Sequence, residues 1–406
     1  MDQKDKAESL SACTLLFQLF GLQYFSLSSK NQLLPTSKLL MHKIIFGCVL
    51  LYVLIEIIGI AVVIKVEQKE LTNDSKNSTK TQMSLLVHYG SYSFMTFVIL
   101  TSALHAWFNS VKAMKIFNQL EKIQKIFEDK TGCVPKYDVF IKKFKTVTVL
   151  FLVLFGSMTV ATLGFIYYHN KSTIFYWALL VVLPYFVMGV TYLRFCFYIE
   201  IININLQTVF DVLKRAFDLK QIMKVEEVQE FHADLMFITK PENETIFDTV
   251  VVLKRIYGLL YETSTWVNEV SGVSSILQIL VFIIGNSSAG YKIFLISSGL
   301  MPIGRIAVPI YTMIFTYGTL AMIVVYACTC YDTSHALLSL LLQFEFNQYE
   351  RQQQYAVSDV ITEFASQMTQ QPIKYTFCGY FNIERSFLAQ IVLTILTYQI
   401  ILTQLN

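Results

Sequence analysis

The sequence predicts an all-α membrane protein with seven transmembrane helices, an inside N-terminus, an outside C-terminus and extended cytoplasmic helices that form an inner anchor bundle. Three observations predict this fold. Hydrophobic residues make up 54% of the 406 residues and charged residues only 15%, against roughly 25% charged residues in soluble domains. Seven apolar stretches are long enough to cross a bilayer. The Lys and Arg residues gather in alternate segments between these stretches.

A transmembrane helix needs about 20 mostly apolar residues, and seven stretches meet this requirement. They are Ile44–Ile64, Ser84–Phe108, Thr146–Tyr168, Thr173–Leu193, Val270–Tyr291, Ile306–Tyr331 and Ser386–Leu405. The run Ile293–Gly304 is too short to cross, and we expect it to form an outer loop. The predicted regions are a cytoplasmic N-terminal segment (1–43), spans one to four (44–193) with a helical inner loop (109–145), a cytoplasmic helical linker (194–269), spans five and six (270–331), a cytoplasmic helical segment (332–385) and span seven (386–406).

The distribution of Lys and Arg predicts the orientation of the chain. Segments 1–43, 109–145, 194–269 and 332–385 hold 25 of the 32 Lys and Arg residues. Because these residues are retained on the cytoplasmic side, the N-terminus is predicted inside. This topology disfavours a G-protein-coupled receptor, and the sequence has neither DRY after the third span nor NPxxY in the seventh. A secondary transporter is also disfavoured, since no internal repeat or pair of broken helices is visible.

The sequence gives no sign of catalysis or of a bound cofactor. It contains no nucleophile elbow, P-loop, dinucleotide-binding fingerprint or HExxH motif. We therefore expect no enzyme activity, no cofactor, no metal site and no nucleic-acid partner.

Four Asn residues start N-x-S/T triplets on the predicted outer side. Asn73, Asn77 and Asn170 lie in short outer loops, and Asn286 lies near the outer end of the fifth span. They are candidates for glycosylation, although such triplets are also common by chance.

The predicted cytoplasmic segments carry one-sided apolar stripes at helical spacing. These stripes are Ile116, Leu120, Ile123 and Phe127; Leu206, Val209, Phe210, Leu213 and Phe217; Leu253, Ile256, Tyr257 and Leu260; and Val357, Val360, Ile361, Phe364 and Met368. A helix with an apolar stripe needs a surface to lie against. The stripes therefore predict either a compact bundle within one chain or a shared base that joins several subunits.

The seventh span carries a polar stripe. Gln390, Thr394, Thr397, Ile401 and Gln404 are separated by gaps of four and three residues, which puts them on one helix face. Such a face should contact protein or water rather than lipid. Hydrogen bonding between helices of one bundle and the lining of a pore are both consistent with it. In a pore, an apolar ring at Ile401 could close the channel by dewetting.

The end of the chain resembles the insect gustatory receptor family, part of the insect chemoreceptor superfamily. Thr397-Tyr398, five residues and Gln404-Leu405 are similar to the TYhhhhhQF signature of that family. The preceding segment Gly379–Glu384 (GYFNIE) is similar to the family's approach to the last span.

The chain departs from the family pattern at three positions. Leu405 stands where the family usually has Phe, which is also similar to the related odorant receptors. Gln399 and Thr403 are polar at positions that are usually apolar. An odorant-receptor-type channel is therefore the alternative within the same superfamily.

The resemblance implies a ligand-gated, non-selective cation channel in the plasma membrane of sensory neurons. It further implies a homo- or heterotetramer, with other gustatory receptors as potential partners and the seventh helices around a central pore. On this basis Ile401 is the predicted gate and Gln404 forms an amide ring beside it. Leu405 stands at the position of the family's terminal Phe, and Thr397 and Thr394 line the wall.

The resemblance also implies a ligand cavity in each subunit, among the outer halves of spans two to six. Candidate lining residues are His88, Tyr89, Tyr92, Ser93, Tyr167, Tyr176, Trp177, Tyr311, Thr312 and Tyr317. Tyr and Trp are also enriched at membrane interfaces, which is the alternative explanation for these aromatic residues. The set is poor in carboxylates and amides, which favours a bitter or other apolar or amphipathic tastant over a sugar.

Overall fold

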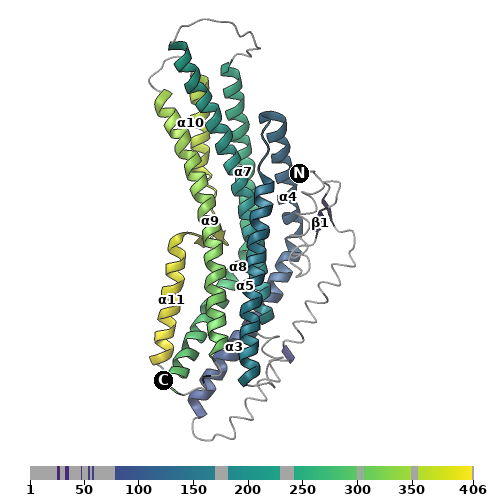
Figure 1. Cartoon of the computed structure of the whole chain (residues 1–406), viewed down its shortest axis with the longest axis vertical. Coiled ribbons are helices and arrows are strands. Elements are labelled where there is room, and N and C mark those ends of the chain that lie inside the picture. The colour runs from purple at the N-terminus through teal and green to yellow at the C-terminus, as the bar shows by residue number, and fades with distance from the viewer. Residues whose placement is uncertain are drawn as a thin grey trace.

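The computed structural model describes a mainly helical chain with its long helices nearly parallel (Figure 1). The described residues are 25–27, 33–35, 47, 54, 57, 58, 78–169, 182–228, 242–299, 303, 306–348 and 355–404. Most of the first predicted span, Ile44–Ile64, lies outside them. The prediction of an all-α fold is confirmed.

Eight helices occupy the described part of the chain. They are α3 (Ser78–Phe108), α4 (Ser110–Thr131), α5 (Tyr137–His169), α7 (Leu183–Val228), α8 (Glu242–Ser297), α9 (Ala307–Gln348), α10 (Tyr355–Gln370) and α11 (Arg385–Gln404). Two short antiparallel hairpins accompany them, one formed by β1 (Phe25–Leu27) and β2 (Leu33–Pro35) and one by β3 (Thr376–Phe377) and β4 (Phe381–Asn382).

Four of these helices are long and apolar enough to cross a membrane. They are the stretches Tyr137–Tyr168, Leu183–Phe217, Ile246–Ser297 and Ala307–Phe344. The helices Ser93–Phe108 and Ser110–Thr131 are bent by 56° relative to each other. If this pair is counted as one span, the number of spans rises to five. Helix α11 contributes a shorter apolar stretch, Arg385–Ile401. The bend between α3 and α4 falls at Asn109, directly after the predicted end of the second span.

Beyond the predicted spans, the helices form what we call the inner bundle. It consists of α4, α10, and residues 194–228 of α7, 242–269 of α8 and 332–348 of α9. Helix α10 packs against α8 and α9 at the end of the subunit opposite α11 (Figure 1). We call the remaining parts of α3, α5, α7, α8 and α9, together with α11, the membrane half.

The apolar stripes predicted from the sequence form the core of the inner bundle. On α4, Ile116, Leu120, Ile123 and Phe127 are buried. The stripes on α8 and α10 face each other, with the Tyr257 and Phe364 rings 5.7 Å apart in an edge-to-face arrangement. The stripes therefore pack within one chain, as the compact-bundle interpretation predicts.

Polar contacts fix the inner bundle at specific points. The Tyr257 hydroxyl donates to the Gln371 carbonyl at 2.9 Å. Burial raises the pKa of Tyr257 to about 12, so the phenol stays neutral and remains a donor. The Glu200 side chain on α7 is only 3% exposed and pairs with Lys143 of α5 at 2.6 Å. A buried carboxylate without such a partner would be strongly destabilising.

Candidate functional site

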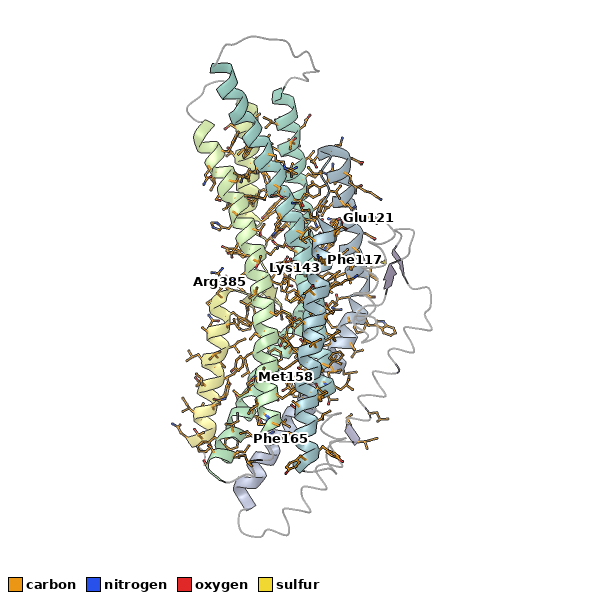
Figure 2. The ribbon with its side chains drawn as sticks, viewed as in Figure 1. Phe117, Glu121, Lys143, Met158, Phe165 and Arg385 are labelled. Carbon is orange, nitrogen blue, oxygen red and sulfur yellow. The ribbon has the colours of Figure 1, made fainter. Side chains whose placement is uncertain are left out.

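Helix α11 lies against α8 and α9 and meets them with one face only. Phe387, Ile391 and Ile395, spaced four residues apart, are buried in this face. Arg385, at the start of α11, lies at about the level of Lys143, and the helix runs from there alongside the half of α5 that holds Met158 and Phe165 (Figure 2). Helix α11 therefore belongs to the membrane half.

The β3–β4 hairpin, which includes most of the GYFNIE segment, holds the beginning of α11. Its loop has positive φ at Cys378 (53°) and Gly379 (75°), which allows the chain to reverse within three residues. Asn268 of α8 binds the hairpin twice, because its Nδ2 donates to the Lys374 carbonyl (2.9 Å) and its Oδ1 accepts from the Thr376 amide (3.1 Å). Gly272, one turn farther along α8, leaves room for Cys378.

The polar stripe of α11 faces away from its own subunit. Gln390, Thr397, Ile401 and Gln404 are exposed, and Thr394 is half-buried. With 3.6 residues per turn, the centre of the stripe lies roughly 100° around the helix from the buried face. The Thr394 and Thr397 hydroxyls donate to the carbonyls of Gln390 (2.8 Å) and Leu393 (2.9 Å) of the same helix.

A third face of α11 is exposed and mainly apolar. It carries Val392, Leu393, Leu396 and Ile400, and its centre lies roughly 150° from the buried face and roughly 100° from the stripe. Helix α11 therefore presents one surface to its subunit, one suited to lipid and one that is polar. Leu405 lies outside the described residues, and the Tyr398 ring is about half exposed beside the stripe.

A small cavity of about 30 Å³ lies between α3, α7, α8 and α9 in the membrane half. It is lined by Phe94, Met95, Tyr185, Val281, Ile284, Gly285, Ser288, Ala289, Lys292, Val308, Pro309 and Thr312. The Tyr185 hydroxyl is hydrogen-bonded to Thr312. This volume suits roughly one or two water molecules, whereas pockets for drug-sized ligands measure about 300–1,000 Å³.

Aromatic rings fill the space between α5, α7 and α9 beside the cavity. Phe155 meets the rings of Phe186 (4.8 Å between centroids) and Phe315 (5.4 Å), and Tyr185 meets Phe315 at 5.5 Å. Gly189 makes this packing possible, because a Cβ there would lie 2.5 Å from the Phe151 ring and 2.8 Å from Phe315.

The structure gathers only part of the predicted pocket. Thr312 lines the cavity, and Tyr311 is buried beside it with its ring against Tyr185. Tyr317 is half-buried, whereas Ser93 and Tyr167 are exposed. His88, Tyr89 and Tyr92 belong to α3, but their side chains lie outside the description. Tyr176 and Trp177 lie outside the described residues altogether.

Sequence reasoning missed Tyr185, Gly285, Ser288 and Lys292. Tyr185 directly follows Pro184 inside the predicted fourth span, which is the one signal that could have drawn attention to it. Gly285 and Ser288 lie near Gly290 in a run of small residues on α8, and such residues let membrane helices approach closely.

Asn286 is not a glycosylation site in this fold, which corrects the prediction from its N-x-S triplet. The side chain is 1% exposed, and its Nδ2 donates to the Thr316 hydroxyl (2.8 Å) and to the Phe282 carbonyl (2.7 Å). A glycan has no access to this amide. Asn73, Asn77 and Asn170 lie outside the described residues.

Comparison with known proteins decides the family. The model of the seven-transmembrane chemosensory receptor family matches residues 10–405. The chain belongs to this family. Among solved structures, that of the insect olfactory receptor OR5 from Machilis hrabei is similar, with a TM-score of 0.68 at 13% identity over the whole of both chains. The structure of the same receptor in complex with eugenol gives 0.64 at 12% identity, again over the whole of both chains. No curated protein sequence matches.

This chemosensory receptor is thus a multi-pass membrane protein with the seven-helix fold of the olfactory receptor, as its sequence predicted. The recognition of the insect chemoreceptor superfamily from the last span is confirmed. The family is one of receptors and not of enzymes. Within the described residues, no three His, Cys, Asp or Glu side chains are placed to hold a metal ion.

Proposed function

We propose that this receptor is a gustatory-type, ligand-gated, non-selective cation channel in the plasma membrane of sensory neurons. Four subunits, identical or mixed with other gustatory receptors, surround a central pore with their α11 helices. The N-terminus lies inside and the C-terminus outside, as the Lys and Arg distribution favours.

The observation that carries this proposal is the division of α11 into three faces. A polar face on a membrane helix is stable only against protein or water, and here it faces neither α8 nor α9. The apolar face with Leu393 and Ile400 is already suited to lipid. Helices from other subunits, enclosing water between them, satisfy the polar face.

Within the pore, each residue of the stripe has a distinct role. Ile401 forms the apolar ring that closes the pore by dewetting, and Gln404 forms the amide ring beside it. Thr394 and Thr397 line the wall. Their hydroxyl protons are directed to backbone carbonyls, which leaves the oxygen lone pairs free to face passing cations. Leu405 follows at the position of the family's terminal Phe.

The ligand enters the cavity beside Tyr185 and Thr312. At about 30 Å³ the cavity must widen to admit it. Its walls combine aromatic rings with a few hydroxyls and one Lys, which supports an apolar or amphipathic tastant over a sugar. The similar olfactory receptor binds eugenol, an amphipathic aromatic compound, and an odorant-receptor-type channel with a volatile ligand is therefore the alternative.

Recording from excised patches without nucleotide tests the channel directly. We expect currents carried by both Na⁺ and K⁺ when quinine or eugenol is applied, and little response to sucrose. Ile401→Ala should produce a steady leak, because a smaller side chain lets water into the constriction. Gln404→Ala should change ion permeability ratios.

Ile400→Ala is the matched control for Ile401→Ala. The two residues are neighbours of the same type with similar exposure, 56% and 45%, but Ile400 lies on the apolar face. We expect wild-type gating for the control. If the two Ile variants behave alike at normal surface expression, Ile401 does not line the pore.

A further inference from the structure

One polar side chain of α11 points into the subunit rather than along the stripe. Gln399 follows Phe387, Ile391 and Ile395 on the buried face and is half-buried. Its Nε2 donates to the backbone carbonyl of Asn286 on α8 at 3.3 Å. The Gln399 side chain therefore links α11 to α8 within the chain.

Gly290 leaves the space on α8 that this side chain occupies. A Cβ at Gly290 would overlap the amide nitrogen and Cδ of Gln399 and would lie 3.1 Å from its Cγ. Because Gly has no Cβ, the whole end of the Gln399 side chain can lie flat on α8. The contact thus depends on two residues together, one on each helix.

The same turn of α8 also forms a wall of the cavity. Gly285, Ser288 and Ala289 line the cavity, Asn286 lies among them in sequence, and Gly290 directly follows Ala289. At 100° per residue, the residues of α8 that line the cavity and the pair Asn286 and Gly290 lie on faces of the helix roughly 140° apart. A displacement of this turn by a ligand therefore moves the surface on which Gln399 rests.

Hydrogen bonds connect the cavity wall to Gln399 without a gap. The Thr316 hydroxyl donates to the carbonyl of Thr312, which lines the cavity, at 2.8 Å. The same hydroxyl accepts from Asn286 Nδ2 at 2.8 Å. The Asn286 carbonyl accepts from Gln399. All of these groups except Gln399 are fully buried.

We propose that Gln399 is a positioning residue that couples the cavity to the pore helix in this receptor. Its bond to Asn286 and its fit on Gly290 hold α11 against α8 while the cavity is small. A ligand that widens the cavity shifts α8 relative to α11, weakens this contact and releases α11. The proposal rests on the proposed channel function.

A ligand can shift a gating equilibrium only through contacts that differ between the two states. The Gln399 contact is made in the state with the small cavity, so losing it favours opening. Gln399→Leu keeps most of the volume and removes the hydrogen bond. We expect a raised basal current and a threefold to tenfold fall in the EC50 for quinine or eugenol, about the effect of one hydrogen bond.

A double-mutant cycle separates coupling from general damage to the fold. Gly290→Ala should open the channel in the same direction, because its Cβ displaces the Gln399 side chain. In the Gln399→Ala background the three atoms nearest to this Cβ are gone, and Gly290→Ala should have little further effect on the EC50. Such non-additivity is the signature of a direct contact.

Thr403→Val is the matched control. Thr403 is the other polar departure from the family pattern in α11, one turn beyond Gln399, and its hydroxyl donates to the Ile400 carbonyl of its own helix at 2.8 Å. We expect wild-type basal current and EC50. The reversal potential should stay unchanged in every variant, since none of them lies in the stripe.

The outcomes distinguish the two proposals. Wild-type EC50 and basal current for Gln399→Leu, or strictly additive effects of Gly290→Ala and Gln399→Ala, would overturn the coupling role while leaving the channel intact. Absence of any cation current from the wild type, with normal amounts at the cell surface, would overturn the proposed function and this inference with it.

Discussion

The inner bundle has ion pairs at the rim of an apolar core, whereas the membrane half places uncharged polar groups inside. In the inner bundle, Lys112–Glu269 and Lys254–Glu363 are ion pairs at the rim. In the membrane half, Asn286 and Thr316 are buried, and large apolar side chains such as Val153 face outward.

This difference follows from what surrounds each half. Water drives apolar stripes together in the inner bundle. Lipid is as apolar as the side chains and provides no such drive, so polar links and small residues decide how membrane helices pair. Asn286–Thr316 is such a link between α8 and α9, and Gly189 and Gly290 are such small residues.

The largest effect is expected from a substitution in the core of the inner bundle. Phe364→Ala removes a fully buried ring that packs against Tyr257, and should lower the free energy of unfolding by about 3–5 kcal/mol. Leu393→Ala, 66% exposed on the apolar face of α11, should change it little. The apparent melting temperature is measured on receptor purified in detergent. Samples are heated, and the folded receptor that remains is quantified by size-exclusion chromatography. Equal shifts for the two variants would contradict the comparison.

Periodicity predicted the inner bundle because one face of each helix there is apolar and the other polar. One such stripe recurs at helical spacing on α4 and is buried, namely Ile116, Leu120, Ile123 and Phe127. The same reasoning found the polar stripe of α11, since polar residues are rare in a membrane span. Its exposure in one subunit is consistent with that prediction, and the pore remains a proposal.

The cavity could not be predicted in the same way. On the membrane helices around the cavity both the outward and the buried faces carry apolar and aromatic residues, so hydrophobicity does not tell a lipid-facing ring from a buried one. Tyr167 and Tyr311 look alike in the sequence, yet one is exposed and the other buried. Which of them is buried depends on the rotation of its helix, and close packing such as that at Gly189 constrains this rotation.

The next effect concerns this packing of rings. Gly189→Ala places a Cβ against Phe151 and Phe315 and should destabilise the receptor by about 1–3 kcal/mol, as overpacking usually does. We also expect a change in the EC50 for eugenol or quinine, because the displaced rings border the cavity. Both are measured on one preparation, by melting temperature and by patch recording.

Gly164→Ala on α5 is the control for Gly189→Ala. A Cβ at Gly164 meets no atom within 4 Å, so this change should be neutral or should stabilise the helix by up to about 1 kcal/mol. If Gly189→Ala were equally well tolerated, the close packing of α5, α7 and α9 would not constrain the cavity.

The smallest effect is expected from the loss of an ion pair at the boundary between the two halves. Arg385, at the start of α11, pairs with Asp332 of α9 at 3.0 Å, and both side chains are largely exposed. An exposed pair contributes at most about 1 kcal/mol and is screened by salt. Arg385→Gln should therefore lower the melting temperature slightly in dilute buffer, and the difference should vanish in 1 M NaCl. A large shift that persists in high salt would show that Arg385 anchors α11 through more than this charge pair. The hairpin contacts of Asn268 would then not be sufficient to hold the beginning of α11.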